Sequence, residues 1–210
     1  MKNIFCLLLI LFSSFSFAQK EFQPKGATMI ETVDGDLDGD QIAEKVIVYN
    51  TKDITEFGNI REIQILKKAN GKWTILEKSR NAILKSGDGG MMGDPYQSTE
   101  IEKGILMITQ AGGSSWKWGY TDKYRFQNGR FELIGYSSSS GKPEEYSTDV
   151  DFNLSTGQLT FEKEVENTKE YGPSKKETVI KKGLKINLQN RNQEKRREIL
   201  LPKTKEKVYL

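Results

Sequence analysis

Hydrophobic and polar residues alternate in short runs along most of the chain. In residues 146–154, Tyr146, Val150, Phe152 and Leu154 share one parity, and the other parity holds serine, aspartate and asparagine. A period of two places successive side chains on opposite faces of a β-strand, so this pattern predicts a strand with one buried and one solvated face. Residues 158–165 repeat the pattern after a glycine-containing turn. The chain therefore reads as a series of strands joined by tight turns.

Two Asn-Gly pairs give the strongest local turn signals. A two-residue type I′ turn requires positive φ at both positions, which asparagine followed by glycine tolerates best. Asn70-Gly71 is expected to join strands at 63–68 and 72–78, and Asn128-Gly129 to join strands at 123–127 and 130–136. No helical periodicity of useful length accompanies them. These patterns predict an antiparallel all-β fold of twisted sheets, in a propeller-like or sandwich arrangement.

Five aromatic residues lie on one parity of the segment 116–126: Trp116, Trp118, Tyr120, Tyr124 and Phe126. A strand through this segment places all five rings on one face, which is what a half-buried sheet needs. Core packing is the favoured interpretation. Trp116 and Trp118, next to a glycine-rich loop, are the expected exceptions and leave open a stacking platform for sugars.

Residues 1–18 have the features of a signal peptide. Lys2 provides a positive start, residues 4–12 are an unbroken apolar run, and the small residues Ser16 and Ala18 mark a cleavage site before Gln19. The run is too short to cross a bilayer, which needs ~20 apolar residues, and no later run is longer, so no transmembrane segment is expected after cleavage. The sequence thus predicts an exported protein, periplasmic or secreted. The single cysteine, Cys6, lies in the leader, so the mature chain is expected to lack disulfides.

Charge and composition exclude several classes of function. The 32 basic and 29 acidic residues leave a net charge of +3, whereas nucleic-acid binding needs a concentrated basic face, so no nucleic acid is expected as a partner. The chain has no histidine, which excludes histidine-based triads and histidine metal ligands. Residues 19–188 are expected to form the all-β domain. Residues 189–210 form a basic C-terminal segment, expected to be a solvated edge or tail, with an arm that touches acidic polymer or phospholipid as the alternative. Residues 208–210 are suited to a last edge strand.

An aspartate-rich loop carries the clearest chemical signal. Asp36, Asp38 and Asp40 alternate with other residues immediately before a predicted strand at 45–50, and Ile42 and Glu44 continue the spacing. Oxygen atoms at alternating positions of a tight loop converge on one point, as a hard cation with six to eight oxygen ligands requires. The expected ligands are the three aspartate carboxylates, the Ile42 carbonyl and the Glu44 carboxylate, around a structural calcium ion. A solvated acidic turn is the alternative.

These residues resemble the integrin-type calcium repeat, or FG-GAP repeat, in which such a loop precedes a β-strand. The resemblance covers the loop and the following strand, and it implies calcium binding by Asp36, Asp38, Asp40, Ile42 and Glu44. Two positions depart from the pattern: Gln41 replaces the usual glycine and is expected to be strained, and Glu44 replaces aspartate. This chain has one such loop, whereas a propeller of the family has several. Over residues 30–160 the chain also resembles a group of uncharacterised secreted bacterial proteins, which implies location and shape only.

Two glycine-rich loops, 86–94 and 110–115, are the remaining candidates for a site. Glycines at this density allow close approach of backbone to backbone or to a ligand, although ordinary loop chemistry explains them as well. Asp88 and Asp94 in the first loop would be the carboxylates of a hydrolase acting on envelope polysaccharide, which is the alternative function. The favoured function is a non-enzymatic β domain with a calcium loop, acting as a binding or envelope component. Its partner is an unknown envelope or extracellular ligand, with a glycan as one candidate.

Overall fold

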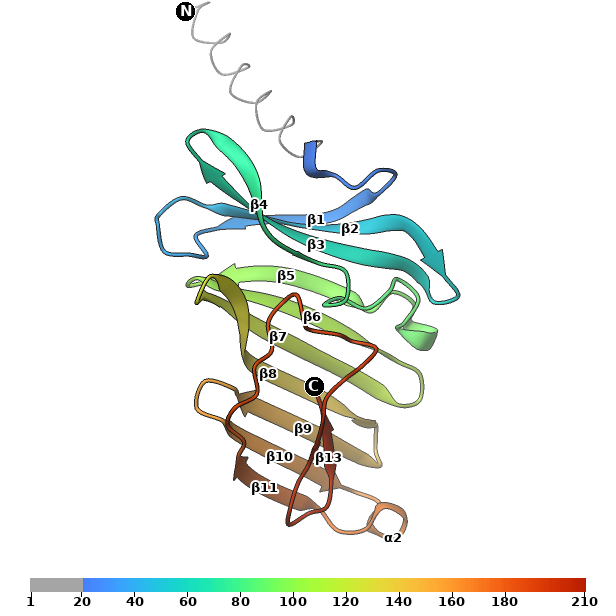
Figure 1. Ribbon diagram of the computed structural model, residues 1–210. Helices are drawn as coiled ribbons and strands as arrows, with labels where there is room; N and C mark the ends of the chain where they lie inside the picture. The colour runs from blue at the N-terminus through green and yellow to red at the C-terminus, as the bar shows by residue number, and fades with distance from the viewer. Residues whose placement is uncertain (1–20) are drawn as a thin grey trace, which may run out of the picture.

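The computed structural model describes residues 21–210 and confirms the all-β prediction (Figure 1). The first sheet has the order β1-β2-β3-β4, made of β1 (Thr28–Gly35), β2 (Glu44–Thr55), β3 (Gly58–Ala69) and β4 (Lys72–Ser79). The expected signal peptide, residues 1–18, lies outside the described residues. Within them, no helix is long and apolar enough to span a membrane.

The second sheet has seven antiparallel strands in the order β11-β10-β9-β8-β7-β6-β5. Its strands are β5 (Tyr96–Glu102), β6 (Ile105–Gly113), β7 (Lys117–Gln127), β8 (Arg130–Lys142), β9 (Tyr146–Asn153), β10 (Gln158–Val165) and β11 (Lys175–Ile180). Two single-turn helices, η1 (Gly90–Met92) and α2 (Thr168–Tyr171), occupy connections. A third sheet pairs β12 (Glu198–Leu200) with β13 (Lys207–Tyr209). This arrangement is compatible with a sandwich.

Both Asn-Gly turns have the backbone that the sequence predicts. The φ angles are 51° and 76° at Asn70 and Gly71, and 53° and 75° at Asn128 and Gly129. They close the β3–β4 and β7–β8 hairpins, with Ala69 opposite Lys72 and Gln127 opposite Arg130. Positive φ at both central residues matches the right-handed twist of the strands, so these turns set the register of the two hairpins.

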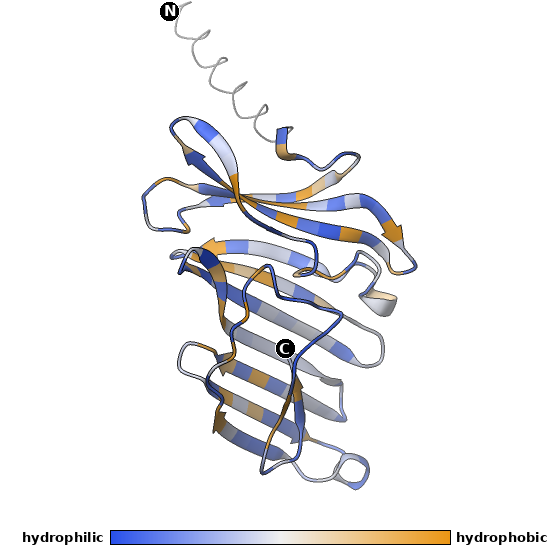
Figure 2. Cartoon of the chain, viewed as in Figure 1, coloured by the Kyte–Doolittle hydropathy of each residue, from blue (hydrophilic) through white to orange (hydrophobic). Residues whose placement is uncertain are grey.

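Hydrophobic and hydrophilic residues alternate along many of the strands (Figure 2). The buried apolar residues form one main core. On β7, Tyr120 and Tyr124 are buried, as the parity of the aromatic residues predicts, whereas Trp116 is 42% exposed. The core joins both sheets, because Val46, Val48, Ile63 and Ile65 of the first sheet belong to the same buried cluster as the apolar face of the second. A smaller cluster, around Ile47 and Tyr49, covers the other face of β2.

The first sheet lies across the β5 edge of the second (Figure 1). Gly35 of β1 packs so closely on Ile101 of β5 that a β-carbon there would lie 2.6 Å from the isoleucine side chain. Glu31 of β1 accepts a hydrogen bond from the Thr99 backbone, 2.9 Å away, and another from the Tyr96 hydroxyl. These contacts fix the first sheet, and the loop that follows β1, relative to the second sheet.

The prediction of a solvated C-terminal tail is wrong. Leu201 and Leu210 are fully buried and Val208 nearly so, all in the main core. The segment runs across one face of the seven-stranded sheet (Figure 1). Residues 208–210 do contribute a last strand, but β13 pairs with β12 rather than extending a larger sheet. The net charge of the segment is a poor guide to its burial. Its apolar residues alternate with the basic ones and most of them are buried in the core, while most of the basic residues are exposed.

Candidate functional site

The aspartate-rich loop connects β1 to β2 and is shaped by its own side chains. The Asp36 carboxylate accepts hydrogen bonds from the backbone of Gly39 (2.7 Å) and Gln41 (2.9 Å). Asp40 accepts one from the Ile42 backbone at 2.8 Å. Aspartate side chains that bind backbone N–H groups two to five residues ahead replace the hydrogen bonds that a turn leaves open. Gln41 has a φ of 68°, in the left-handed region that favours glycine. This is the strained conformation that the sequence predicts at this position.

The loop brings three of the five predicted ligand residues together. Asp36, Asp38 and Asp40 each offer a carboxylate oxygen, and these oxygens lie within 4.8 Å of one another. An oxygen-only cluster of this size has the chemistry of a hard-cation site, so the group is able to hold a metal ion.

Lys67, on β3, lies against this cluster. Its ammonium group pairs with Asp38 and with Asp40, the latter at 2.7 Å. The hydrogen bond to Asp38 raises the pKa of Lys67, and the bond from Lys67 lowers the pKa of Asp40. No local pattern predicts this pair, because Lys67 is 27 residues from Asp40 and reaches it only through the register of β3. One cation therefore already offsets part of the negative charge of the three carboxylates.

Glu44 begins β2 directly after the loop and is completely buried. One of its carboxylate oxygens accepts a hydrogen bond from the Leu37 backbone at 2.8 Å, and the other has no hydrogen-bond partner among residues 21–210. Burial raises the pKa of Glu44, and the nearby charges of Asp38 and Asp40 raise it further. A buried carboxylate oxygen without a partner is unfavourable, and either a proton or a cation at this oxygen would relieve the cost.

Ile42, the fifth predicted ligand, is an exposed residue of the loop, with 48% of its surface accessible. Its backbone N–H is used by Asp40. The structure thus gathers Asp36, Asp38 and Asp40 into one group. Of the other two predicted ligands, Glu44 is buried beside the loop and is not a member of this group, and Ile42 is exposed.

The two glycine-rich loops pack against each other. The Gly113 backbone donates a hydrogen bond to the Gly89 carbonyl at 2.9 Å. A β-carbon at Gly112 would lie 2.5 Å from the Trp118 ring and 2.8 Å from the Gly89 α-carbon, so only glycine fits there. This contact also covers part of the Trp118 ring, near the start of β7.

Asp88 and Asp94, the carboxylates of the hydrolase alternative, both have structural partners. Asp88 accepts a hydrogen bond from the Lys85 backbone at 2.9 Å and closes its own turn. Asp94 pairs with the buried guanidinium of Arg61 and accepts a bond from the Tyr96 backbone. These contacts favour loop-shaping roles for both carboxylates.

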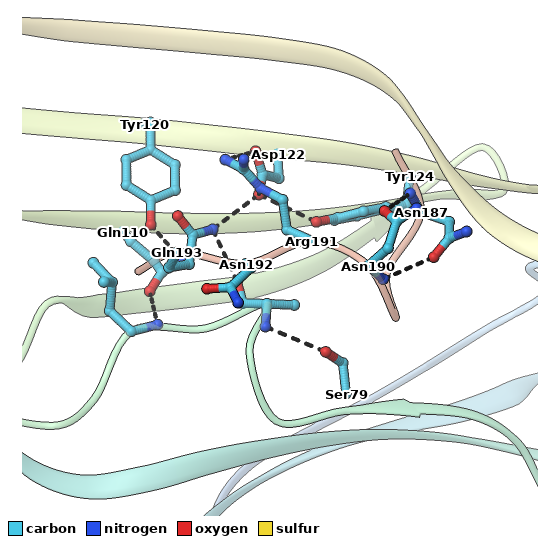
Figure 3. Close-up of polar contacts among 12 residues, drawn as sticks. Ser79, Gln110, Tyr120, Asp122, Tyr124, Asn187, Asn190, Arg191, Asn192 and Gln193 are labelled. Atoms are coloured by element: carbon cyan, nitrogen blue, oxygen red, sulfur yellow. Dashed lines mark hydrogen bonds and ion pairs between the residues drawn. The ribbon is translucent and has the colours of Figure 1, made fainter. Parts of the chain in front are cut away.

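A buried polar cluster, missed by the sequence reading, holds the C-terminal segment on the sheet (Figure 3). Asp122 of β7 is fully buried and accepts hydrogen bonds from Arg191 (2.8 and 3.1 Å), Gln193 (3.3 Å) and the Tyr124 hydroxyl (3.1 Å). Gln193 also donates to the Ala82 carbonyl at 3.1 Å. Asp122 lies on the same parity as the aromatic residues of this strand, and this position was the one feature of the sequence that indicated a buried carboxylate. Such a saturated ion pair is typical of structural fixation rather than of a reactive centre.

Comparison with family models, with curated proteins and with solved structures gave no match.

Proposed function

We propose that this protein is an exported, non-enzymatic β domain that binds an envelope or extracellular ligand, with a calcium ion as a structural part of its 36–44 loop. The observation that carries the calcium assignment is the combination of three clustered aspartates with a buried glutamate oxygen that lacks a partner. Lys67 supplies a single positive charge to the three clustered aspartates, through its pairs with Asp38 and Asp40. A divalent cation would offset more of the charge and would give the free oxygen of Glu44 a partner.

Calcium is preferred over magnesium because of the shape of the loop. The aspartates lie on an irregular, solvent-accessible turn, and water can complete the coordination there. Calcium accepts six to eight oxygen ligands in flexible geometry, whereas magnesium requires near-ideal octahedral geometry at ~2.0–2.1 Å. Since Lys67 now contacts Asp38 and Asp40, binding of the ion requires this side chain to move away.

Thermal unfolding in calcium, magnesium and chelator tests the ion assignment. Calcium at ~5 mM, about 10 times a mid-range extracellular Kd, should raise the melting temperature, magnesium should raise it less, and chelator should reverse the shift. Asp40→Asn should remove most of the shift. Asp53→Asn is the matched control, because Asp53 also pairs with a cation, Arg80 at 2.5 Å, but lies outside the loop. Equal melting temperatures of the wild type in calcium and in chelator would contradict the assignment.

Export is tested separately, by the N-terminus of the protein recovered outside the cytoplasm. Mass spectrometry should find a chain that begins at Gln19, with or without cyclisation of the glutamine. A chain in that fraction that still begins at Met1 would contradict the proposed export.

A further inference from the structure

A hollow of about 270 Å³ lies between the inner face of the seven-stranded sheet and the C-terminal segment. The sheet contributes Trp118, Tyr120 and Tyr136, and the C-terminal segment contributes Arg196, Lys207 and Tyr209. Its volume lies just below the ~300–1,000 Å³ that is usual for ligand clefts, so it suits one ring-sized group.

Aromatic rings form one side of the hollow. Trp118 stacks on Tyr120 with ring centroids 5.9 Å apart and planes 17° apart, and Tyr136 follows at 6.0 Å from Tyr120. At the mouth, Trp116 is 42% and Tyr209 47% exposed. Aromatic rings that remain open at a hollow offer flat apolar faces to a ligand. Serine and threonine residues line the same space and can supply hydrogen bonds; they are Ser138, Ser139, Ser140 and Thr148.

Positive charge distinguishes this hollow from an ordinary gap in the core. The Arg196 guanidinium lies 4.9 Å from the centre of the Tyr120 ring and makes no ion pair with any carboxylate among the described residues. Lys207, in contrast, pairs with Glu198 at 3.1 Å. Arg196 is thus an available cation held beside aromatic faces, where a ligand carboxylate can form charge-assisted hydrogen bonds with it.

We propose that this hollow binds an acidic saccharide, with a sugar ring against the aromatic residues and its carboxylate on Arg196. A sugar ring has apolar C–H faces and polar hydroxyl edges, which match the rings and the serine and threonine hydroxyls respectively. A larger groove shares Trp118 and Ser140 with the hollow and continues past Lys117 and Lys163. This groove is also lined by Glu144, Glu162, Glu164 and Glu166, so its charge is mixed and the carboxylate of the ligand is assigned to Arg196 in the hollow. This inference rests on the proposed binding role and does not require the calcium loop.

Calorimetric titration with trigalacturonate, and with maltotriose as a neutral sugar of the same length, tests the assignment. Trigalacturonate should bind, and maltotriose should bind much more weakly. Added salt should weaken the binding of trigalacturonate, because it screens the charges. Arg196→Gln should reduce affinity by about 10-fold or more, the effect of losing a hydrogen bond to a charged group. Arg197→Gln is the matched control, because it removes the same charge from the adjacent exposed residue outside the hollow. It should change affinity by less than about 2-fold, since exposed charges at a distance are screened.

Trp116→Ala should weaken binding with only a small change in melting temperature, because this residue is 42% exposed and lies outside the buried core. Undetectable binding of trigalacturonate, equal binding of the neutral sugar, or equal losses in Arg196→Gln and Arg197→Gln would overturn the proposal. So would binding of phosphatidylglycerol vesicles by a protein that does not bind trigalacturonate. Repeating the titration in chelator separates the saccharide proposal from the calcium proposal. A protein that binds trigalacturonate but shows no response to calcium would contradict only the calcium proposal.

Discussion

Removal of the Arg191 guanidinium should strongly destabilise the protein. The side chains of Asp122 and Arg191 are only 1% and 2% accessible, and Arg191 provides two of the hydrogen bonds that Asp122 accepts. Arg191→Ala leaves a buried carboxylate without its counter-ion, which should lower the free energy of unfolding by about 3–5 kcal/mol. For a domain of 150–250 residues, each kcal/mol corresponds to about 2–4 °C, so the melting temperature should fall by about 6–20 °C.

Urea unfolding followed by tryptophan fluorescence measures this loss, with Lys195→Ala, an exposed neighbour, as control. The double variant Asp122→Leu with Arg191→Met removes both charges and should recover most of the stability lost in Arg191→Ala, because the penalty comes from the unpaired charge. A loss below about 1 kcal/mol in Arg191→Ala, or a double variant less stable than that single variant, would refute the reasoning about the buried pair.

Two further predictions concern backbone fit and pH. Gly112→Ala should cost about 1–3 kcal/mol, because its β-carbon meets the Trp118 ring and the Gly89 backbone. Gly71→Ala should cost ~1 kcal/mol, since the φ of 76° is strained for alanine but the space is open; the opposite order in urea unfolding would contradict this. Burial raises the pKa of Glu77, so the folded state holds this proton more tightly and the wild type gains stability as pH falls through the folded pKa. The free energy of unfolding of Glu77→Gln, minus that of the wild type, should therefore decrease between pH 7 and pH 4.5 (about the unfolded pKa). If this quantity stays constant or increases as pH falls, the prediction is contradicted.

Local patterns predicted the strands and turns well. The segment expected at 158–165 is strand β10 with the same limits, and both Asn-Gly hairpins have the expected backbone. These features depend on neighbouring residues, so the sequence contains them directly. The pattern of buried residues on β8 is harder to predict, because this strand contains a bulge. Tyr124 lies opposite Leu133 and Lys123 opposite Gly135, so Ile134 has no partner on β7. Buried positions change parity there, from Leu133 to Tyr136, and no alternating pattern predicts such a shift.

Long-range pairing explains what the sequence reading missed in the sites. The aspartates of the loop are close in sequence, and their grouping follows from the turn. Lys67 joins them through the register of β2 and β3, and Arg191 reaches Asp122 across 69 residues. A charged residue in a basic segment gives no local sign that its partner is buried elsewhere. The net charge of the C-terminal segment therefore predicts a solvated segment, although its apolar residues belong to the core.

Direct calcium binding by the wild type and by Glu44→Gln tests the central claim most closely. Glutamine keeps the size of Glu44 and an oxygen to accept the Leu37 N–H, but it loses the charge beside the aspartates. Calorimetry on chelator-treated wild type should show one calcium ion bound per chain, with a Kd of ~10⁻⁴–10⁻³ M, and Glu44→Gln should bind much more weakly while remaining at least as stable without calcium. No heat of binding by wild type up to ~10 mM calcium, about ten times the upper Kd, or equal affinity in the two proteins, would contradict the calcium site.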